Sequence, residues 1–289
     1  MNFDDLIQKK LIQVRYHDYL PLRLFKYGRK VFYKNLFPQD IRFRWARGLG
    51  LDDHNRIAIR PFFKYYNYGE QNAGNDWKDD DPVVATRKFN GFMMCLTRFN
   101  GELVYSSTGT FNSDYVELGK RYIESQVVNW NRIEEGYTYI FEICAAEDPH
   151  IINEQIGVYL IGVQNHDAWN LHGFDCPVHQ QPWYIEDIAF NIGFKTPTPR
   201  LTNFGDLKEE LSTVEHEGFM VYSVGTDMFN GPNSESVIKM KSPYYLVTKL
   251  LARHALHQDH RPKFGKLRQI IDEEYYDLLN ELEANQEEF

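Results

Sequence analysis

The sequence predicts an α+β fold, with a body of antiparallel sheets followed by a small helical tail. Two observations predict the sheets. Short β-branched and aromatic runs recur along the chain, and residues typical of tight turns separate them. A third observation predicts the tail, because the apolar pattern becomes helical after Pro243 and stays so to the end. We therefore expect a body of residues 1–242 and a helical C-terminal extension of residues 243–289.

The elements of the N-terminal part follow from turn signals. Residues 3–35 do not resolve into helix or strand. β-Branched and aromatic residues predict strands over Ile41–Leu51 and Ile57–Ile59, joined by a turn at residues 52–55. Residues 72–81 are polar and rich in aspartate, so we expect an exposed loop there.

The Asn100-Gly101 pair is the strongest short hairpin signal in the chain. It predicts a hairpin of two strands, over residues 91–98 and 102–107. Two later apolar runs, Tyr137–Cys144 and Val158–Val163, predict further strands, the second of them buried because it is almost entirely apolar.

A helix is predicted to begin after Ser113, which would cap it, and to continue toward Trp130, with Gly119 as an unfavourable residue inside it. Residues 219–224 and 236–241 predict another antiparallel pair of strands. The C-terminal helical pattern has one apolar stripe, formed by Ile270, Ile271, Tyr275, Leu278, Leu279 and Leu282.

The composition is that of a folded globular protein. Hydrophobic residues make up 43% of the 289 positions, and no run of about 18 apolar residues could span a membrane. Residues 1–5 are partly acidic and lack the apolar segment of a secretory signal. Cys95, Cys144 and Cys176 are widely spaced and odd in number, which suits reduced thiols better than disulfides. We therefore expect a cytoplasmic protein with no membrane partner.

Charge is spread unevenly along the chain. The formal net charge of −9 argues against a protein that coats nucleic acid nonspecifically. Basic residues nevertheless cluster at Arg42, Arg44 and Arg47, and again between residues 249 and 268, before the chain turns acidic from Asp272 onward. Each basic cluster is either a solvated face or a short contact with RNA or DNA, and the sequence leaves both interpretations open.

Chemistry is indicated by an ordered set of short segments, since none of them would be informative alone. Lys88-Phe89-Asn90-Gly91 is followed by a carboxylate in an apolar strand, Glu142, by a second carboxylate, Glu217, and by the pair Lys239 and Lys241. Two lysines two positions apart on a strand face the same side and can converge on one phosphate. Carboxylates can hold a magnesium ion or bond a ribose hydroxyl.

Lys88 is the candidate nucleophile of this set. A lysine amine attacks only when it is neutral, so burial or neighbouring cations must lower its pKa from about 10.4. We expect Arg87, Lys239 and Lys241 to supply those cations. Gly91 would let a bound nucleotide approach the backbone closely, because glycine has no side chain.

These residues resemble a known family, the covalent nucleotidyltransferases, and in particular the phage-type ATP-dependent RNA ligases of the RNA ligase 1 group. The resemblance spans about residues 47 to 241. Lys88-Phe89-Asn90-Gly91 is similar to the motif that carries the adenylylated lysine. The other matching segments are Arg47-Gly48, the run Arg60-Pro61-Phe62-Phe63-Lys64-Tyr65-Tyr66-Asn67, Phe141-Glu142-Ile143, Glu217-Gly218 and Lys239-Met240-Lys241.

The resemblance implies a nucleotidyltransferase fold with the ATP-grasp-like antiparallel sheets of DNA and RNA ligases. It implies that ATP and Mg²⁺ are the cofactors and that the 5′-phosphate and 3′-hydroxyl ends of RNA are the partners, in RNA or tRNA repair. The body would be the adenylyltransferase domain, with Lys88, Lys239 and Lys241 as catalytic residues. The implied nucleotide-binding residues are Arg47, Lys64, Gly91, Glu142 and Glu217, the last two also serving as metal ligands.

Some properties are left open by the resemblance. An end-healing kinase or phosphatase partner is possible, and the compartment would be a host cytoplasm if the protein is viral. The segment Ser106–Thr110 carries hydroxyl groups where the family usually has basic residues, so one phosphate or RNA contact is missing or supplied elsewhere. Alternatives are a catalytically idle nucleotide- or RNA-binding module, a DNA ligase or a capping-type enzyme. The short helical segment after Lys241 argues against the last two, which normally append an OB domain there.

A separate group of zinc-ligand residue types occurs at His166, His172, Cys176 and His179. Their spacing matches no common zinc finger. We therefore favour an ordered loop over a zinc site for this segment.

Overall fold

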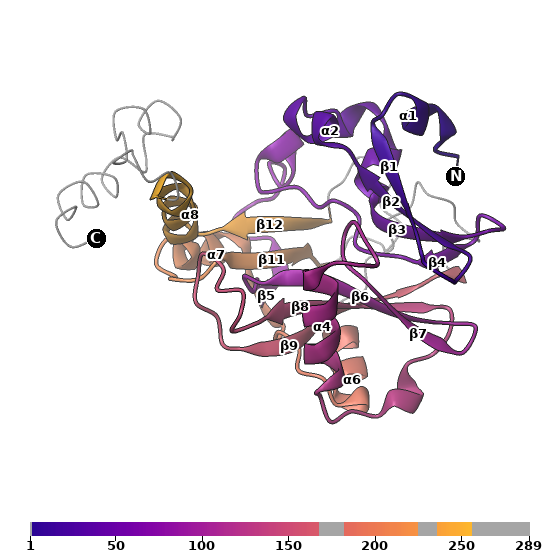
Figure 1. Ribbon diagram of the computed structural model, residues 1–289. Helices are drawn as coiled ribbons and strands as arrows, with labels where there is room; N and C mark the ends of the chain where they lie inside the picture. The colour runs from indigo at the N-terminus through magenta and orange to yellow at the C-terminus, as the bar shows by residue number, and fades with distance from the viewer. Residues whose placement is uncertain (1, 168–181, 225–235, 256–289) are drawn as a thin grey trace.

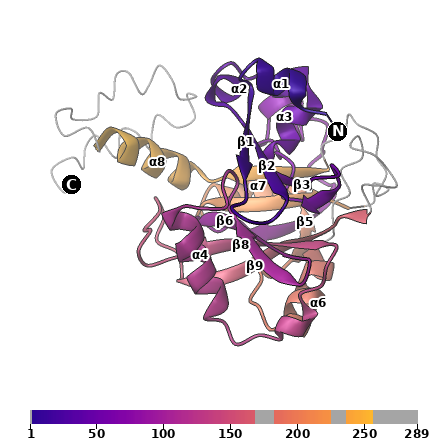
Figure 2. The same cartoon turned by 45° about the vertical axis from the view of Figure 1, so that its right-hand side comes forward.

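The computed structural model describes residues 2–167, 182–224 and 236–255. Within them the chain forms three four-stranded sheets in which all paired strands are antiparallel. Figures 1 and 2 show the N-terminal sheet lying above the other two, with helices on the outer faces. The predicted α+β class is confirmed.

The N-terminal sheet has the order β1-β2-β3-β4. Its strands are β1 (Ile12–Tyr16), β2 (Leu22–Tyr27), β3 (Arg47–Asp52) and β4 (Ile57–Ile59). Its outer face is covered by α1 (Asp4–Gln8), α2 (Arg29–Tyr33), the short 3₁₀ helix η1 (Phe37–Gln39) and α3 (Ile41–Trp45). Apolar residues of β2 and β4 pack on the opposite face, against Cys95, Val104 and Ile140 of another sheet.

The strand predicted over Ile41–Leu51 is wrong in its first half. Residues 41–45 form helix α3, and only β3 is a strand, paired with β4 as the hairpin signal indicated. The helix begins because the Asp40 side chain accepts a hydrogen bond from the backbone nitrogen of Arg42 at 2.9 Å. This cap outweighs the strand preference of the branched and aromatic residues that follow it.

The central sheet has the order β10-β5-β11-β12. Its strands are β10 (Arg200–Asn203), β5 (Pro82–Arg87), β11 (Gly218–Ser223) and β12 (Val237–Lys241). The predicted pairing of the last two is confirmed, and their register places Met220 opposite Lys239 and Gly218 opposite Lys241. Residues 72–81 precede β5 as a mostly exposed turn region that begins with the 3₁₀ helix η2 (Glu70–Asn72), as expected for a loop.

The third sheet has the order β7-β6-β8-β9. Its strands are β6 (Phe92–Phe99), β7 (Glu102–Ser106), β8 (Tyr137–Cys144) and β9 (Gly157–Asn165). All four were predicted. Asn100 and Gly101 join the first two with φ angles of 51° and 82°, the left-handed conformation that this pair of residues favours in a hairpin turn.

Two helices cover one face of the third sheet: α4 (Asp114–Glu124) and α6 (Pro182–Ile192). The α4 helix begins after Ser113 as predicted, but it ends at Glu124, and Trp130 lies in the separate 3₁₀ helix η3 (Trp130–Arg132). Gly119 is required by packing, since a Cβ there would lie 2.6 Å from Cγ of Met94 in β6. The glycine that weakens the helix in isolation therefore lets it dock closely on the sheet.

The remaining helices are α7 (Phe204–Leu211) and α8 (Pro243–Ala255). The α8 helix begins at Pro243, where the helical tail was predicted to begin. The apolar stripe predicted for residues 270–282 lies outside the described residues, as do His172, Cys176 and His179. No helix in the described part of the chain is long and apolar enough to cross a membrane.

The Ser113 cap gives a test of this local structure. Its hydroxyl accepts a hydrogen bond from the backbone nitrogen of Val116 at 3.2 Å. We expect Ser113→Ala to lower the free energy of unfolding by about 1 kcal/mol, because a helix-terminal N–H loses its acceptor. Urea denaturation followed by circular dichroism measures the change. Ser113→Asp, which keeps an acceptor, should stay close to wild type, and equal losses in both variants would contradict the capping role.

Candidate active site

Lys88 lies where the chain passes from the central sheet to the third sheet, between the end of β5 and the start of β6. Its backbone nitrogen donates to the carbonyl oxygen of Gly218 at 2.9 Å. At the other end of the crossing, the nitrogen of Gly91 donates to Oε1 of Glu142 at 3.0 Å. A Cβ at Gly91 would lie 2.3 Å from the carbonyl oxygen of Ile143, so only glycine fits there. Both neighbouring sheets therefore fix the position of the lysine.

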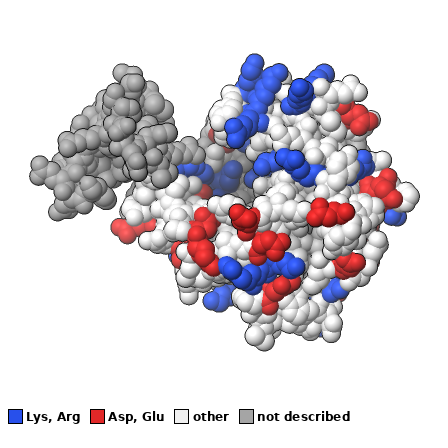
Figure 3. Space-filling view, viewed as in Figure 1, with Lys and Arg blue, Asp and Glu red and all other residues white. Residues whose placement is uncertain are grey.

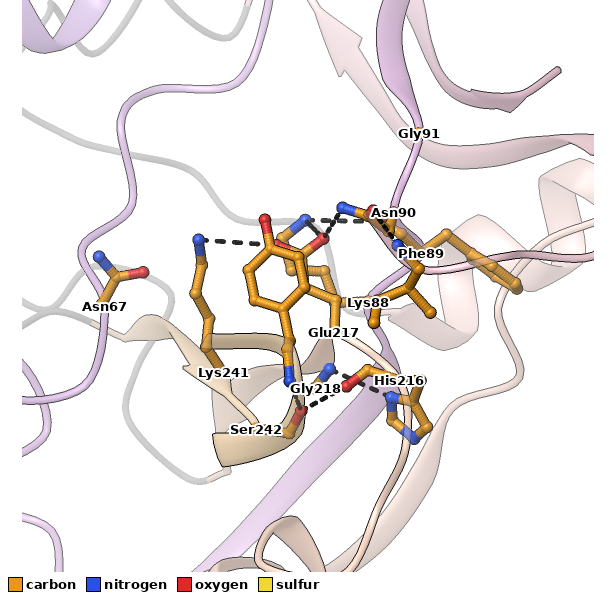
Figure 4. Close-up of polar contacts among 12 residues, drawn as sticks. Asn67, Lys88, Phe89, Asn90, Gly91, His216, Glu217, Gly218, Lys241 and Ser242 are labelled. Atoms are coloured by element: carbon orange, nitrogen blue, oxygen red, sulfur yellow. Dashed lines mark hydrogen bonds and ion pairs between the residues drawn. The ribbon is translucent and has the colours of Figure 1, made fainter. Parts of the chain in front are cut away.

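The carboxylate of Glu217 lies at the centre of the cluster that Figure 4 shows. Its Oε2 is 2.9 Å from Nζ of Lys88 and accepts a hydrogen bond from Nδ2 of Asn90 at 3.0 Å. Its Oε1 is 3.6 Å from Nζ of Lys241. Glu217 is only 3% exposed, so these groups replace the water that the buried charge has lost.

These carboxylates set the protonation of Lys88. Burial lowers the pKa of the Lys88 amine, but the negative charges of Glu217 and Glu142 outweigh burial and raise the pKa above its ordinary value. Burial raises the pKa of Glu142, and the Lys88 charge opposes it. Burial also acts to raise the pKa of Glu217, yet Lys88 and Lys241 lower it overall. The expectation that neighbouring cations lower the pKa of Lys88 is therefore wrong, because the nearest charges are those of Glu217 and Glu142.

Lys239 has a different environment from Lys88. Its backbone nitrogen donates to the Tyr66 carbonyl at 3.0 Å and its own carbonyl accepts from Tyr68 at 2.9 Å, which ties β12 to the segment after β4. Burial lowers the pKa of the Lys239 amine to about 7, and the positive charges of Arg47 and Lys64 add to this shift. A cluster of cations that repel one another in a buried place is suited to bind an anion.

Lys64 itself is held by an acidic partner. Its amine lies 2.6 Å from Oε1 of Glu70, and Oε2 of Glu70 accepts hydrogen bonds from the backbone and side chain of Asn67. Burial lowers the pKa of Lys64 in spite of this pair. Lys64 therefore adds positive potential at Lys239 but is not one of the residues that line the cavity.

A cavity of about 390 Å³ brings the predicted residues together. It is lined by seven of the eight predicted site residues, namely Arg47, Lys88, Gly91, Glu142, Glu217, Lys239 and Lys241. Its other walls are largely apolar and aromatic, with Phe62, Ile161, Pro182 and Met220 among them. The volume, and a lining that combines apolar and aromatic residues with charged ones, suit a nucleotide.

Glu154, which the sequence analysis missed, also holds the segment between β5 and β6 that carries Lys88. Glu154 accepts a hydrogen bond from Nη2 of Arg87 at 2.7 Å and one from the backbone nitrogen of Asn90 at 3.3 Å. Oδ1 of Asn90 in turn accepts from the backbone nitrogen of Ile152 at 3.1 Å. The loop before β9 thus holds residues on both sides of the lysine. Glu154 lies in an irregular segment without periodicity, so no sequence signal identified it.

The basic cluster at residues 42–47 has two different roles. Arg42 pairs with Asp5 and Asp40 at 2.6 Å each. The guanidinium of Arg44 is buried, donates to the carbonyl of Lys64 and lies 3.6 Å from the centre of the Phe63 ring. These two arginines therefore stabilise the fold, and only Arg47 of the cluster faces the cavity.

The site can supply ligands for a divalent cation. Glu142 and Glu217 both line the cavity beside Lys88, and carboxylate oxygens are the donors that Mg²⁺ and Mn²⁺ prefer. The described residues contain no group of three or more His, Cys, Asp or Glu side chains that could hold a metal by themselves. His166 is buried and shares a 2.8 Å hydrogen bond with the Thr138 hydroxyl. This bond explains how a histidine is tolerated in the core without a metal ion.

Comparison with known proteins places the chain in a family. A family model described as RNA ligase matches residues 45–245, and the chain belongs to that family. No curated protein sequence matches it significantly.

Solved structures show the same fold at low sequence identity. An archaeal ATP-dependent RNA ligase has a TM-score of 0.61 and 11% identity, with 92% of this chain and 68% of that chain covered. A putative ATP-dependent DNA ligase from Aquifex aeolicus has a TM-score of 0.62 and 11% identity, with 99% and 71% covered. These likenesses establish the ligase nucleotidyltransferase fold.

The low pKa of Lys239 predicts that this residue destabilises the free protein while it favours the binding of ATP. Between pH 7 and about 10.4, the ordinary lysine pKa, the Lys239 amine is mostly protonated in the unfolded protein and mostly neutral in the folded protein. Burial of the charged amine therefore lowers the free energy of unfolding most below pH 7, and this loss shrinks as the pH rises. We expect Lys239→Met to raise the urea midpoint of the free protein at pH 6, with a smaller gain at pH 9.5. The same substitution should weaken ATP binding, measured by calorimetry. The exposed Lys78→Met variant is the control, and a lower midpoint for Lys239→Met at pH 6 would contradict the pKa assignment.

Proposed function

We propose that this protein is an ATP-dependent RNA ligase that joins a 5′-phosphate to a 3′-hydroxyl through a lysyl-AMP intermediate on Lys88. The observation that carries the proposal is one cavity that is lined by Lys88, two carboxylates (Glu142 and Glu217), four further cations (Arg47, Arg87, Lys239 and Lys241) and several apolar residues. Family membership supports RNA as the substrate.

The cavity suggests how ATP would be oriented. We assign the base to the apolar and aromatic lining residues and the phosphates to the charged ones. Lys239 and Lys241 would contact the α-phosphate, and Arg47 would orient the leaving pyrophosphate with the positive potential of Lys64 behind it. Glu142 would bond a ribose hydroxyl or a water on a metal ion. Catalysis would then come from positioning and charge neutralisation, as phosphoryl transfer generally requires.

The reaction has three displacements at phosphorus. The neutral amine of Lys88 attacks the α-phosphate, forming an N–P bond while the bond to pyrophosphate breaks. A 5′-phosphate oxygen of RNA then displaces the lysine, giving an RNA-adenylate. A 3′-hydroxyl finally attacks the 5′-phosphate and releases AMP, which leaves a phosphodiester bond.

Lys88 must lose a proton before it attacks, and its carboxylate partners oppose that loss. A divalent cation such as Mg²⁺ held by Glu217 and Glu142 would neutralise those carboxylates and the phosphate charge. Asn90 keeps Glu217 in place through its amide, independently of the lysine. The acidic neighbours thus hold the amine in position while it is charged.

Several finer properties remain part of the proposal. Residues 1–242 would form the adenylyltransferase domain and residues 243–289 its C-terminal extension. A role in RNA or tRNA repair, a kinase or phosphatase that prepares the RNA ends, and a cytoplasmic location are consistent with the activity. Buried Cys95 and Cys144 are free thiols, which suits a reducing compartment.

The covalent intermediate gives the primary test. Purified protein incubated with ATP and Mg²⁺, after treatment with pyrophosphate to remove bound AMP, should gain the mass of one AMP by intact mass spectrometry. Lys88→Ala should gain nothing, because the variant lacks the amine that forms the N–P bond with the α-phosphate. Lys78→Ala, which changes an exposed lysine, should behave as wild type. Absence of any adduct on the wild type with ATP or GTP would leave a catalytically idle binding module.

Comparison of substrates distinguishes an RNA ligase from a DNA ligase and from a capping-type enzyme. Sealing of 5′-phosphorylated RNA and DNA of one sequence distinguishes an RNA ligase from a DNA ligase, which shares this fold. An adduct formed from GTP but not from ATP would indicate a capping-type enzyme. We expect an adduct with ATP and preferential sealing of RNA.

The raised pKa of Lys88 predicts the pH dependence of adduct formation. At saturating ATP, the single-turnover rate should rise with pH above 7, because a larger fraction of the amine is neutral. Glu217→Gln removes the main charge that raises this pKa, so its profile should shift to lower pH even though its maximal rate is reduced. A shift of the Glu217→Gln profile to higher pH would contradict the pairing of Lys88 with Glu217.

A further inference from the structure

An acid-free segment of the chain, which runs from β2 through α2, carries four exposed cations. Residues 19–39 contain no Asp or Glu in a protein whose net charge is −9. Lys26, at the end of β2, and Arg29, Lys30 and Lys34, in and just after α2, are all exposed. In the described part of the chain none of the four forms an ion pair. Figure 3 shows Lys and Arg side chains gathered over α2, above the hollow in the molecular surface, and acidic side chains below it.

Two aromatic side chains stand among these cations. Phe32 and Tyr33 of α2 are 59% and 78% exposed. Only Val31 of this helix is buried, so packing of the fold does not require the two rings. Exposed rings interleaved with unpaired cations are the combination that binds single-stranded nucleic acid, because bases stack on the rings and phosphates contact the cations.

Lys26 connects this surface to the active-site cavity. It lies opposite Arg47 in the β2–β3 pairing, and Arg47 lines the cavity. The Lys26 side chain lies over the hydroxyl-rich segment after β7, since a Cβ on Gly109 would be 2.5 Å from its Cδ and 2.6 Å from its Nζ. Thr108, the preceding residue, also lines the cavity. A basic group from another strand therefore stands beside the segment that lacks basic residues of its own.

We propose that Lys26, Arg29, Lys30, Phe32, Tyr33 and Lys34, which we call the α2 surface, bind the single-stranded RNA next to the end that is joined. The inference rests on the proposed function, and it adds where the RNA strand lies. Lys26 contacts the phosphate nearest the cavity. The residues of α2 contact the following nucleotides by charge and by stacking, without reading their sequence.

Direct RNA binding tests the charged part of the α2 surface without any chemistry. The probe is a short single-stranded RNA with a 5′-phosphate and a 3′ fluorophore, and its anisotropy is measured without ATP over a series of salt concentrations. We expect the Lys30→Ala/Lys34→Ala double variant to bind more weakly, and the slope of log K against log salt to become shallower by about 1.4, at roughly 0.7 for each lost phosphate contact. The control is Lys78→Ala/Lys208→Ala, which removes two lysines outside the α2 surface: exposed Lys78, and Lys208, which pairs with Asp79. An unchanged slope in the α2 variant, or equal changes in both, would overturn the proposal.

Aromatic variants test stacking separately from charge. Phe32→Ala and Tyr33→Ala should each weaken RNA binding about fivefold or more at any salt concentration, because a stacked base loses its platform. Phe190→Ala is the matched control, since Phe190 of α6 is 86% exposed and lies outside the α2 surface. Equal effects of all three substitutions would overturn the stacking role.

Lys26 distinguishes an RNA phosphate from the triphosphate of ATP as the ligand. Lys26→Ala should form the AMP adduct at the wild-type rate with limiting ATP, yet seal RNA with a raised KM, and Lys26→Arg should recover most of the sealing. Slower adduct formation in Lys26→Ala would assign this amine to ATP instead. Adduct formation by the wild type tests the proposed function and RNA anisotropy tests the α2 surface, so each can fail without the other.

Discussion

The Glu217 carboxylate is the group on which the arrangement of the site depends. One oxygen pairs with Lys88 and accepts from Asn90, and the other faces Lys241. A buried carboxylate is costly unless it is paired and hydrogen-bonded, and removing one partner leaves an uncompensated charge. The positions of the nucleophile, the amide and the second lysine are therefore coupled, and none of them can move alone at low cost.

Backbone contacts transmit this coupling to the sheets. The Lys88 nitrogen bonds to the Gly218 carbonyl directly after Glu217, so the nucleophile and its carboxylate are fixed to one another through the main chain. Gly218 itself has a φ of 126°, and a Cβ there would lie 2.0 Å from the carbonyl oxygen of Met240. Glycine is thus required where β11 begins beside the end of β12. Gly218 is therefore required for packing of the strands, and its carbonyl also holds the backbone of Lys88.

The two ends of the charged wall are electrostatically unlike. Around Lys88 the acidic groups are close, and the amine is held protonated. Around Lys239 the neighbours Arg47 and Lys64 are cationic, and the pKa falls to about 7. Buried cations that repel one another weaken the free protein, and an anionic ligand relieves that repulsion. Such a conflict between local stability and charge is typical of a binding site.

The sequence was informative where a local signal decides the structure and uninformative where long-range contacts decide it. Asn100-Gly101 and the apolar runs gave all four strands of the third sheet, whereas the exposed β10 strand carries no alternation that could predict it. The order of motifs gave the cavity residues, but the sign of the Lys88 pKa shift depends on which charges come nearest. Glu154 lies in a loop and Glu70 begins the short helix η2, so only the folded chain brings them to Arg87 and Lys64.

Basic residues show the same limit, because a charge count does not tell whether a cation has a partner. Arg42 and Arg44 belong to the denser basic cluster in the sequence. In the structure, however, Arg42 pairs with two carboxylates and Arg44 packs on an aromatic ring. The cations of β2 and α2 are more scattered, but no acidic residue lies among them and no ion pair in the described residues neutralises them. An acidic protein can therefore attract a polyanion locally, because exposed charges act over a Debye length of about 8 Å at physiological salt rather than through the net charge. Where an unpaired cation also lies beside the reaction cavity, as Lys26 does, it can hold the strand in line with the reacting groups.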